Sequence, residues 1–128
     1  MSKLEAGVGV SMLENSLEAG REAARQAIFK MNGVPQVLVV FAAKRFNHRK
    51  LLDGISVETG NVPMVGGTTA GEISSNGFST QSVVVLAMRS EKLSFTTGIG
   101  LNMSNNEIAC SKNLVQNLRE KNRWKNQK

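Results

Sequence analysis

The sequence lacks residues that several classes of protein require. Its 128 residues include one cysteine, Cys110, so an internal disulfide cannot form and the cysteine-rich secreted class is excluded. His48 is the only histidine, and one cysteine with one histidine is too few for a zinc site built by this chain alone. We therefore expect no metal and no other cofactor.

Long hydrophobic runs are also missing. The longest, Val37–Ala43 and Val83–Met88, are far below the ~20 residues that a membrane-spanning helix needs. Residues 1–16 contain no continuous apolar stretch of the kind that a signal peptide carries. The sequence thus predicts a soluble protein of the cytoplasm, with no membrane partner.

Aromatic residues are few, and basic residues are concentrated in two places. There is no tyrosine, and the single tryptophan, Trp124, lies near the C-terminus. The net charge is +6, but residues 44–50 and 112–128 together carry +9, which leaves −3 for the rest. Because single-stranded nucleic acids are bound by aromatic residues interleaved with basic ones, we do not expect a nucleic-acid partner. Contacts to phosphates by this loop and tail are the alternative.

What is present is the composition of one ordinary globular domain. Apolar residues make up 41% of the chain and charged residues 20%, and 128 residues suffice for a single core. We expect one domain over residues 1–118. A basic, polar tail over residues 119–128 should fray from the last helix.

Hydrophobic periodicity predicts an α/β fold with a mixed β-sheet and helices packed on it, in the order β-α-β-α-β-β-β-α. Strands are predicted at Ala6–Val10, Val37–Ala43, Pro63–Val65, Gln81–Met88 and Leu93–Leu101. Helices are predicted from Ser16 to about Met31, from the N-cap Asn47 to about Thr59, and after the capping box Ser104–Glu107. The dipeptide Asn76-Gly77 indicates a hairpin turn.

The same periodicity predicts which side chains are buried. Val37–Ala43 is continuous and rich in β-branched residues, which is typical of a strand buried on both faces. Asn15 is the expected N-cap of the first helix, with Glu18 three residues on. The small residues of that helix should let it lie close to whatever it covers. The expected inward faces are Leu17, Gly20, Ala24, Ile28 and Met31 in the first helix, Leu51, Leu52 and Ile55 in the second, and Ile108, Ser111, Val115 and Leu118 in the last.

Two stretches of the sequence resemble each other at a separation of 91 residues. Val8-Gly9-Val10 aligns with Ile99-Gly100-Leu101, and Leu17, Ala24 and Ala27 align with Ile108, Val115 and Leu118. A chance match of small apolar residues is the alternative. If the repeat is real, the last strand and helix begin a second half that this chain does not finish, which leaves an unpaired sheet edge or a bare helix face. The repeat therefore predicts a homo-oligomer or a missing companion domain.

The most unusual stretch is Gly66–Glu72, which has three glycines, two threonines and an acid after a predicted strand. Glycines there would let the backbone approach a ligand, with free N–H groups for an anion. The alternative is that these glycines only allow close packing. The stretch is not a P-loop, because no Gly-Lys-Ser/Thr follows, and its glycine spacing differs from that of the dinucleotide fingerprint.

Two further groups of residues bear on chemistry. Thr68 and Thr69 are candidate nucleophiles, but a hydroxyl needs a neighbouring base and nothing in the sequence places His48 within reach. Arg45 follows a buried strand, where open α/β sheets bind their ligands, and is placed to pair with a carboxylate or phosphate beside Phe46. The alternative is a solvated basic loop with Phe46 turned into the core. We expect no catalytic centre.

Taken in order, several of these stretches resemble the N-terminal part of FIST domains, the sensory modules named for F-box and intracellular signal-transduction proteins. The resemblance is carried by Val8–Ser11, Gly20 with its alanine-rich helix, Val37–Phe41, Leu51–Ile55 and Pro63–Ile73. Its most specific part is GGTTAGEI followed by a hydrophobic strand, and it covers roughly residues 6–118. Family members continue past the fifth strand, usually into a companion domain, so this chain resembles a short version.

The resemblance implies a non-enzymatic sensory domain of signal transduction that binds a small amino-acid-like or carboxylate ligand. It carries over only the motif from Gly66 to Glu72. With residues at neighbouring strand ends, the expected ligand site comprises Ser11, Phe41, Arg45, Gly66, Gly67, Thr68, Thr69, Gly71 and Glu72. Backbone N–H groups and Arg45 would hold a carboxylate, and Glu72 or Thr69 an ammonium or hydroxyl group. The alternatives are a protein-interaction or oligomerisation module without a pocket, and a hydrolase with a threonine nucleophile.

Overall fold

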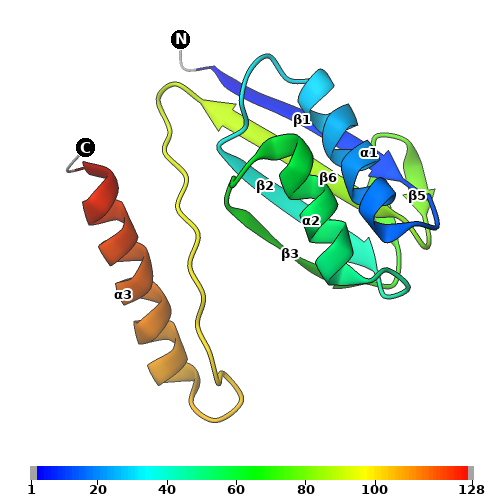
Figure 1. The fold of residues 1–128 in the computed structure, drawn as a ribbon. Helices are drawn as coiled ribbons and strands as arrows, with labels where there is room; N and C mark the ends of the chain where they lie inside the picture. The colour runs from blue at the N-terminus through cyan, green and yellow to red at the C-terminus, as the bar shows by residue number, and fades with distance from the viewer. Residues whose placement is uncertain (1–2, 127–128) are drawn as a thin grey trace. The chain divides into compact units, whose positions relative to one another are not determined.

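A computed structural model of the chain describes residues 3–126, which divide after Ser94 into two compact units (Figure 1). The first unit contains β1 (Leu4–Ser11), α1 (Ser16–Phe29), β2 (Val37–Ala43), α2 (His48–Thr59), β3 (Met64–Thr69), β4 (Glu72–Ser74), β5 (Gly77–Ser79) and β6 (Val83–Ser90). The second unit contains α3 (Glu107–Asn126), preceded by an extended segment. The predicted α/β class and the order of strands and helices are confirmed. No helix among the described residues is long and apolar enough to span a membrane.

The main sheet has the strand order β1-β6-β2-β3 and is mixed, as predicted. β6 pairs antiparallel with both β1 and β2, whereas β2 and β3 are parallel. The registers place Gly9, Val85, Val40 and Gly66 side by side in one row across all four strands. The remaining strands, β4 and β5, form the hairpin that Asn76-Gly77 predicted, closed where Ser74 pairs with Gly77.

Both helices of the first unit cover the same face of this sheet, as Figure 1 shows. α1 lies directly on β1, because a Cβ added to Gly9 would come within 1.8 Å of the Ala23 carbonyl oxygen. The core between the layers is made of small and β-branched side chains. It includes Ala19, Ala23, Ala24 and Ala27 of α1, Leu51 and Ile55 of α2, Leu38, Val40 and Ala42 of β2, and Val83, Val85 and Ala87 of β6.

The helix boundaries follow their predicted caps, but the buried faces differ in detail. Asn15 accepts a hydrogen bond from the Glu18 N–H and Asn47 accepts one from the Lys50 N–H, both at 3.1 Å. α1 ends two residues earlier than predicted and buries its alanines, whereas Leu17 and Ile28 are half-buried. Leu52 was predicted to point inward and is 41% exposed, because α2 lies beside β3, at the edge of the sheet.

The predictions for the two parallel strands, β2 and β3, were only partly right. β2 has its predicted bounds, and its burial on both faces is partly confirmed. On the face away from the helices Val37 and Ala43 are buried, whereas Phe41 between them is 45% exposed. The predicted strand Pro63–Val65 continues to Thr69, so Gly66–Thr69 is not a loop. The reason is that β2 offers a ladder partner along its whole length, and backbone pairing needs no side chain.

The second unit is an extended segment packed along α3. A Cβ on Gly98 or Gly100 would lie 2.8 Å from Leu118 Cδ2 or 2.7 Å from Cys110 Sγ, so these glycines allow the close approach. Lys121 adds a hydrogen bond to the Thr97 carbonyl. The predicted strand Leu93–Leu101 is wrong, since the described segment joins no sheet ladder.

Other predictions for α3 were also wrong. Its cap is Asn106, whose side chain accepts from the Ala109 N–H at 3.0 Å, rather than Ser104. The buried side is shifted from the predicted one, with Cys110 buried and Ile108 69% exposed, because Gly98 and Gly100 contact the Cys110–Leu118 side. The helix does not fray after residue 118 but continues to Asn126, and residues 127–128 lie outside the described residues.

The structure supports the 91-residue repeat. Gly7 and Gly9 of β1 contact Ala27 and Ala23, and the residues 91 positions later, Gly98 and Gly100, contact Leu118 and Leu114. The contacting helix residues are themselves separated by the same 91 positions. Each unit therefore contains an extended segment whose alternate glycines admit a helix at equivalent places.

Candidate functional site

A groove of about 340 Å³ lies between α2 and the edge strand β3. We call it the α2–β3 groove. Its walls are mostly apolar. They are formed by His48, Leu51 and Leu52 of α2, Val40 and Ala42 of β2, and Met64, Val65, Gly66, Gly67 and Thr68 of β3. The first three residues of the glycine-rich stretch Gly66–Glu72 are part of its lining.

The groove exists because the chain lacks a side chain where β3 faces α2. Gly66 stands opposite Val40, in the row that faces the helices, so nothing projects from β3 at that point. Gly66 has a φ of 156°, and a Cβ there would lie 1.7 Å from the Val40 carbonyl oxygen. Only glycine fits this backbone, and the glycine opens the groove.

Within residues 3–126, the edge position of β3 also leaves backbone groups without a strand partner. The Leu38 N–H donates to the Pro63 carbonyl at 2.9 Å, so residue 63 directs its polar groups toward β2. Because successive residues of a strand direct these groups to opposite sides, Gly66 and Thr68 direct theirs away from β2, at the open edge. Two peptide N–H groups therefore lie beside an apolar groove.

Of the nine residues expected to form a ligand site, three line this groove: Gly66, Gly67 and Thr68. Phe41 lies on the opposite face of the sheet, since it alternates with the inward-facing Val40 and Ala42. Ser11 donates its hydroxyl to Glu22 of α1. Gly71 lies against the ring of Phe78.

Glu72 and Thr69 belong to a buried polar cluster rather than to the groove lining. Glu72 is 3% exposed, and its carboxylate accepts hydrogen bonds from the hydroxyls of Thr69 and Ser82. The Ser82 N–H lies 3.4 Å from the same carboxylate, and the hydroxyls of Ser82 and Ser79 are 2.7 Å apart. This cluster ties the end of β3 to the hairpin and to the start of β6.

The Thr69–Glu72 contact bears on the hydrolase alternative. Sequence reasoning found no base within reach of either threonine, whereas the structure places a carboxylate on the Thr69 hydroxyl. Both oxygens of that carboxylate are already occupied, one by Thr69 and the other by Ser82. These hydrogen bonds satisfy the polar atoms of a buried carboxyl group, as burial requires.

Arg45 is engaged by the backbone of two other loops, the one after β1 and the one before β6. Its Nε donates to the Gln81 carbonyl at 2.8 Å, and its Nη2 donates to the carbonyls of Met12 and Leu13 at 3.0 Å. Its guanidinium lies 4.0 Å from the centroid of the Phe46 ring, which is 4% exposed. The alternative that placed Phe46 in the core is thus confirmed, and Arg45 holds loops together at this end of the sheet.

Sequence reasoning missed the α2 side of the groove. It predicted Leu52 to face the core and gave His48 no place in a site, whereas both line the groove. The signal that could have found them is the β2-α2-β3 unit. A helix that connects two parallel strands packs over those strands, so its first turns lie near their carboxyl ends.

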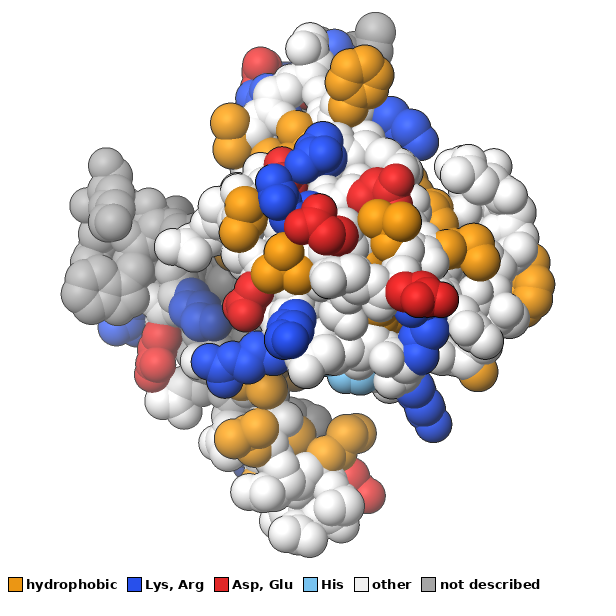
Figure 2. Space-filling view, turned by 45° about the vertical axis from the view of Figure 1, so that its right-hand side comes forward, with side chains coloured by type: hydrophobic (Ala, Val, Ile, Leu, Met, Phe, Trp, Pro, Cys, Tyr) orange, Lys and Arg blue, Asp and Glu red, His pale blue; other side chains and the backbone are white. Residues whose placement is uncertain are grey.

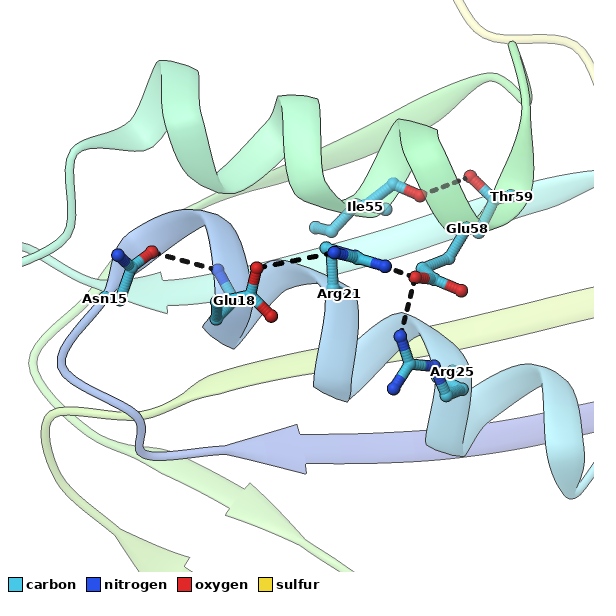
Figure 3. A network of polar contacts seen from close by, with 7 residues as sticks. All are labelled: Asn15, Glu18, Arg21, Arg25, Ile55, Glu58 and Thr59. Atoms are coloured by element: carbon cyan, nitrogen blue, oxygen red, sulfur yellow. Dashed lines mark hydrogen bonds and ion pairs between the residues drawn. The ribbon is translucent and has the colours of Figure 1, made fainter.

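A charged network fixes α2 against α1 (Figure 3). Glu58 Oε1 accepts hydrogen bonds from Arg21 Nε and Arg25 Nη2, each at 2.9 Å, and Arg21 also contacts Glu18 at 3.4 Å. The hydrogen bonds from Arg25 and then Arg21 hold the pKa of Glu58 below its usual range. The same contacts raise the pKa of both arginines.

Charges of both signs are interspersed with apolar side chains on the face that Figure 2 shows, and they do not form one large basic area there. Among the described residues, no three His, Cys, Asp or Glu side chains are grouped so that they could hold a metal ion. The α2–β3 groove is lined mostly by apolar side chains and backbone, and its polar side chains are those of His48 and Thr68.

The chain was compared with protein families, curated proteins and solved structures. A family model described as the FIST N domain matches residues 36–127, which include the whole groove. Among solved structures, an empty FtsZ dimer from M. jannaschii matches with a TM-score of 0.40 and 14% sequence identity. That match covers 73% of this chain and 32% of the other, so this chain spans about a third of its length. No curated protein matches significantly.

Proposed function

Because the chain belongs to the FIST N domain family, a family of sensory domains in signal transduction, we propose that it binds a small carboxylate with an apolar body in the α2–β3 groove. Apolar amino acids are members of this class. In this proposal the chain is non-enzymatic and acts in the cytoplasm. The observation that carries it is the glycine-opened groove beside two backbone N–H groups.

Each part of such a ligand has a matching part of the groove. Leu51, Leu52 and Met64 offer apolar walls of the kind that ligand pockets use for most of their area. The N–H groups of Gly66 and Thr68 are donors suited to a carboxylate, as backbone groups are in many anion sites. His48 lies at the first residue of α2 and offers a further donor.

The contacts of Arg45 and Glu72 further restrict the chemical class of ligand that the groove would bind. Arg45 donates to three carbonyls, and Glu72 accepts from Thr69 and Ser82, so neither is offered to a ligand. An ammonium group would therefore gain little here beyond contact with solvent. The proposal therefore favours simple carboxylates over amino acids of the same apolar body.

The test is thermal stabilisation by a panel of apolar amino acids and short aliphatic carboxylates. A ligand at 100 times its Kd adds ~2.7 kcal/mol to the stability, which a melting curve resolves readily. Thr68→Trp fills the groove and should abolish the shift, whereas Thr80→Trp, at an exposed site outside the groove, should leave it unchanged. No stabilisation by any compound, or an equal shift in Thr68→Trp, would reject the proposal.

A further inference from the structure

The open edge of β3 presents hydrogen-bond donors and acceptors in alternation (Figure 1). Met64, Gly66 and Thr68 direct their N–H and C=O groups away from β2, because the residues between them pair with it. Residues 65–68 are all exposed. Edge strands are ordinarily protected by charged residues or proline, and the six residues of β3 include neither. The edge therefore has the pattern that a further β-strand requires.

These backbone groups are spaced for a peptide rather than for a single carboxylate. The N–H groups of Gly66 and Thr68 are two residues apart, which is roughly 6.6 Å along a strand. The two oxygens of one carboxylate are bonded to the same carbon and cannot reach both donors. The Gly66 carbonyl between the donors repels an anion, whereas it accepts a peptide N–H. A peptide strand repeats its own groups at the same interval and satisfies all of them.

The groove supplies the place for one side chain of such a strand. A residue paired beside Gly66 directs its side chain to the same face of the sheet as Gly66 and Val40, which is the face that α2 covers. Gly66 has no side chain to occupy this space, and Leu51 and Leu52 form its wall. The volume of about 340 Å³ leaves room for a branched aliphatic side chain. The groove therefore favours an apolar residue at this position of the peptide.

The charge at one end of the groove determines the direction of the peptide. His48 and Thr68 both line this end, because the first turn of α2 lies at the carboxyl end of β3. The N-terminus of a helix favours an anion, and the first turn of α2 holds no acid. Arg49 and Lys50 in the same turn take part in none of the ion pairs among residues 3–126. A C-terminal carboxylate at this end makes the added strand parallel to β3.

We propose that the α2–β3 groove binds the C-terminus of an extended peptide, which adds a strand parallel to β3. The inference rests on the proposed function, since the last two residues of the peptide form the carboxylate with an apolar body. The penultimate residue lies beside Gly66, and its side chain enters the groove. The last residue donates its N–H to the Gly66 carbonyl, and its carboxylate accepts from the Thr68 N–H, as a parallel ladder requires. A strand β3 from a second copy would bring no anion to the basic end, since β3 has no charged residue.

The experiment measures the fluorescence anisotropy of the peptide Gly-Ser-Thr-Thr-Leu-Ala, labelled with fluorescein at its N-terminus, on titration with the full chain. Saturable binding at micromolar concentrations is expected. Amidation of the C-terminus should weaken binding by about tenfold or more, since it removes the charged acceptor of the Thr68 N–H. Methylation of the last amide nitrogen should weaken it similarly, because that N–H pairs with the Gly66 carbonyl. Methylation of the preceding amide nitrogen is the matched control, since that N–H points away from β3 and binding should be unchanged.

Variants of the chain test the same contacts from the side of the protein. Thr68→Pro removes an N–H that does not pair with β2, on an edge strand where proline is tolerated, and should abolish binding. Thr68→Val keeps that N–H and should retain binding. Leu52→Asp puts a charge in the apolar wall and should weaken binding by about tenfold or more. Val57→Asp is its control, since Val57 is 67% exposed on α2 and does not line the groove.

Circular dichroism shows whether each variant folds, and the methylated peptides test the pairing on the unaltered chain. Equal binding of the two methylated peptides, or of the acid and the amide, would overturn the inference. The proposed function would then stand if small aliphatic carboxylates still stabilise the chain, and both would be rejected if neither the carboxylates nor the peptide bind. A chain that binds no peptide, sediments as a dimer and becomes monomeric in Thr68→Pro would also overturn the inference, because a second copy would occupy the edge.

Discussion

Gly20 of α1 and Gly54 of α2 lie where these two helices cross, and each faces the backbone of the other helix. A Cβ on Gly20 would come within 2.2 Å of the Leu51 carbonyl oxygen, and one on Gly54 within 2.1 Å of the Leu17 carbonyl oxygen. The absence of both side chains sets how closely α2 approaches α1. That distance in turn sets the position of Leu51 and Leu52 over β3, and so the width of the α2–β3 groove.

Gly54→Ala should therefore destabilise the protein by about 1–3 kcal/mol, since the helices must separate to make room. The sign of this change in stability is informative, because replacing glycine by alanine inside a helix ordinarily stabilises the helix by ~1 kcal/mol. Urea denaturation measures the change. Gly67→Ala is the control, since a Cβ there meets no atom within 4 Å. A stable Gly54→Ala variant would contradict the close crossing.

Glu58→Gln should lower stability near neutral pH by up to about 1 kcal/mol, since its two arginine contacts are partly exposed. The folded state lowers the pKa of Glu58, so the carboxylate stabilises the fold above the ordinary glutamate pKa. This stabilisation is lost as the pH falls through the lowered pKa of the folded state. Thermal melts from pH 7 down to pH 2 should show the wild-type and variant curves converging. The same substitution at the exposed Glu91 should show no such convergence.

Ser82→Ala should cost about 1–3 kcal/mol, because it removes a hydroxyl donor from the buried Glu72 carboxylate. Chemical denaturation measures the change in the free energy of unfolding. Ser75→Ala, in the exposed turn of the hairpin, should be neutral. Equal stability of the two variants would mean that the cluster does not support the fold.

Gly100→Val should detach the extended segment from α3, since a Cβ at this position lies 2.9 Å from the Cys110 carbonyl oxygen. Amide exchange in α3 should then accelerate by about tenfold or more, while the unit up to Ser94 keeps its protection. Ile99→Ala is the matched control, because Ile99 is 67% exposed and alternates with the glycines. Unchanged exchange in α3 after Gly100→Val would argue against the glycine contacts that support the repeat.

The sequence by itself determined the elements whose signals are local. Asn15 and Asn47 cap their helices, Val37–Ala43 is a strand, and Asn76-Gly77 closes a hairpin, because caps, short apolar runs and turn dipeptides act within a few residues. The stretch Gly66–Glu72 could also be identified as unusual from composition alone. Likewise, the 91-residue repeat was visible before any contact was known.

Only the tertiary structure decided which of these residues meet. Gly66 opens a groove because β3 pairs with β2 at the edge of the sheet. Glu72 does not line this groove, because its carboxylate accepts a hydrogen bond from Ser82, which directly precedes β6. Arg45 donates to carbonyls of two loops that are distant in the sequence, and no residue spacing predicts these contacts. Leu93–Leu101 alternates like a strand yet has no ladder, since a strand needs a partner that periodicity cannot supply. Side-chain pattern is a local property, whereas strand order, edge position and polar partners arise from contacts between segments far apart in the chain.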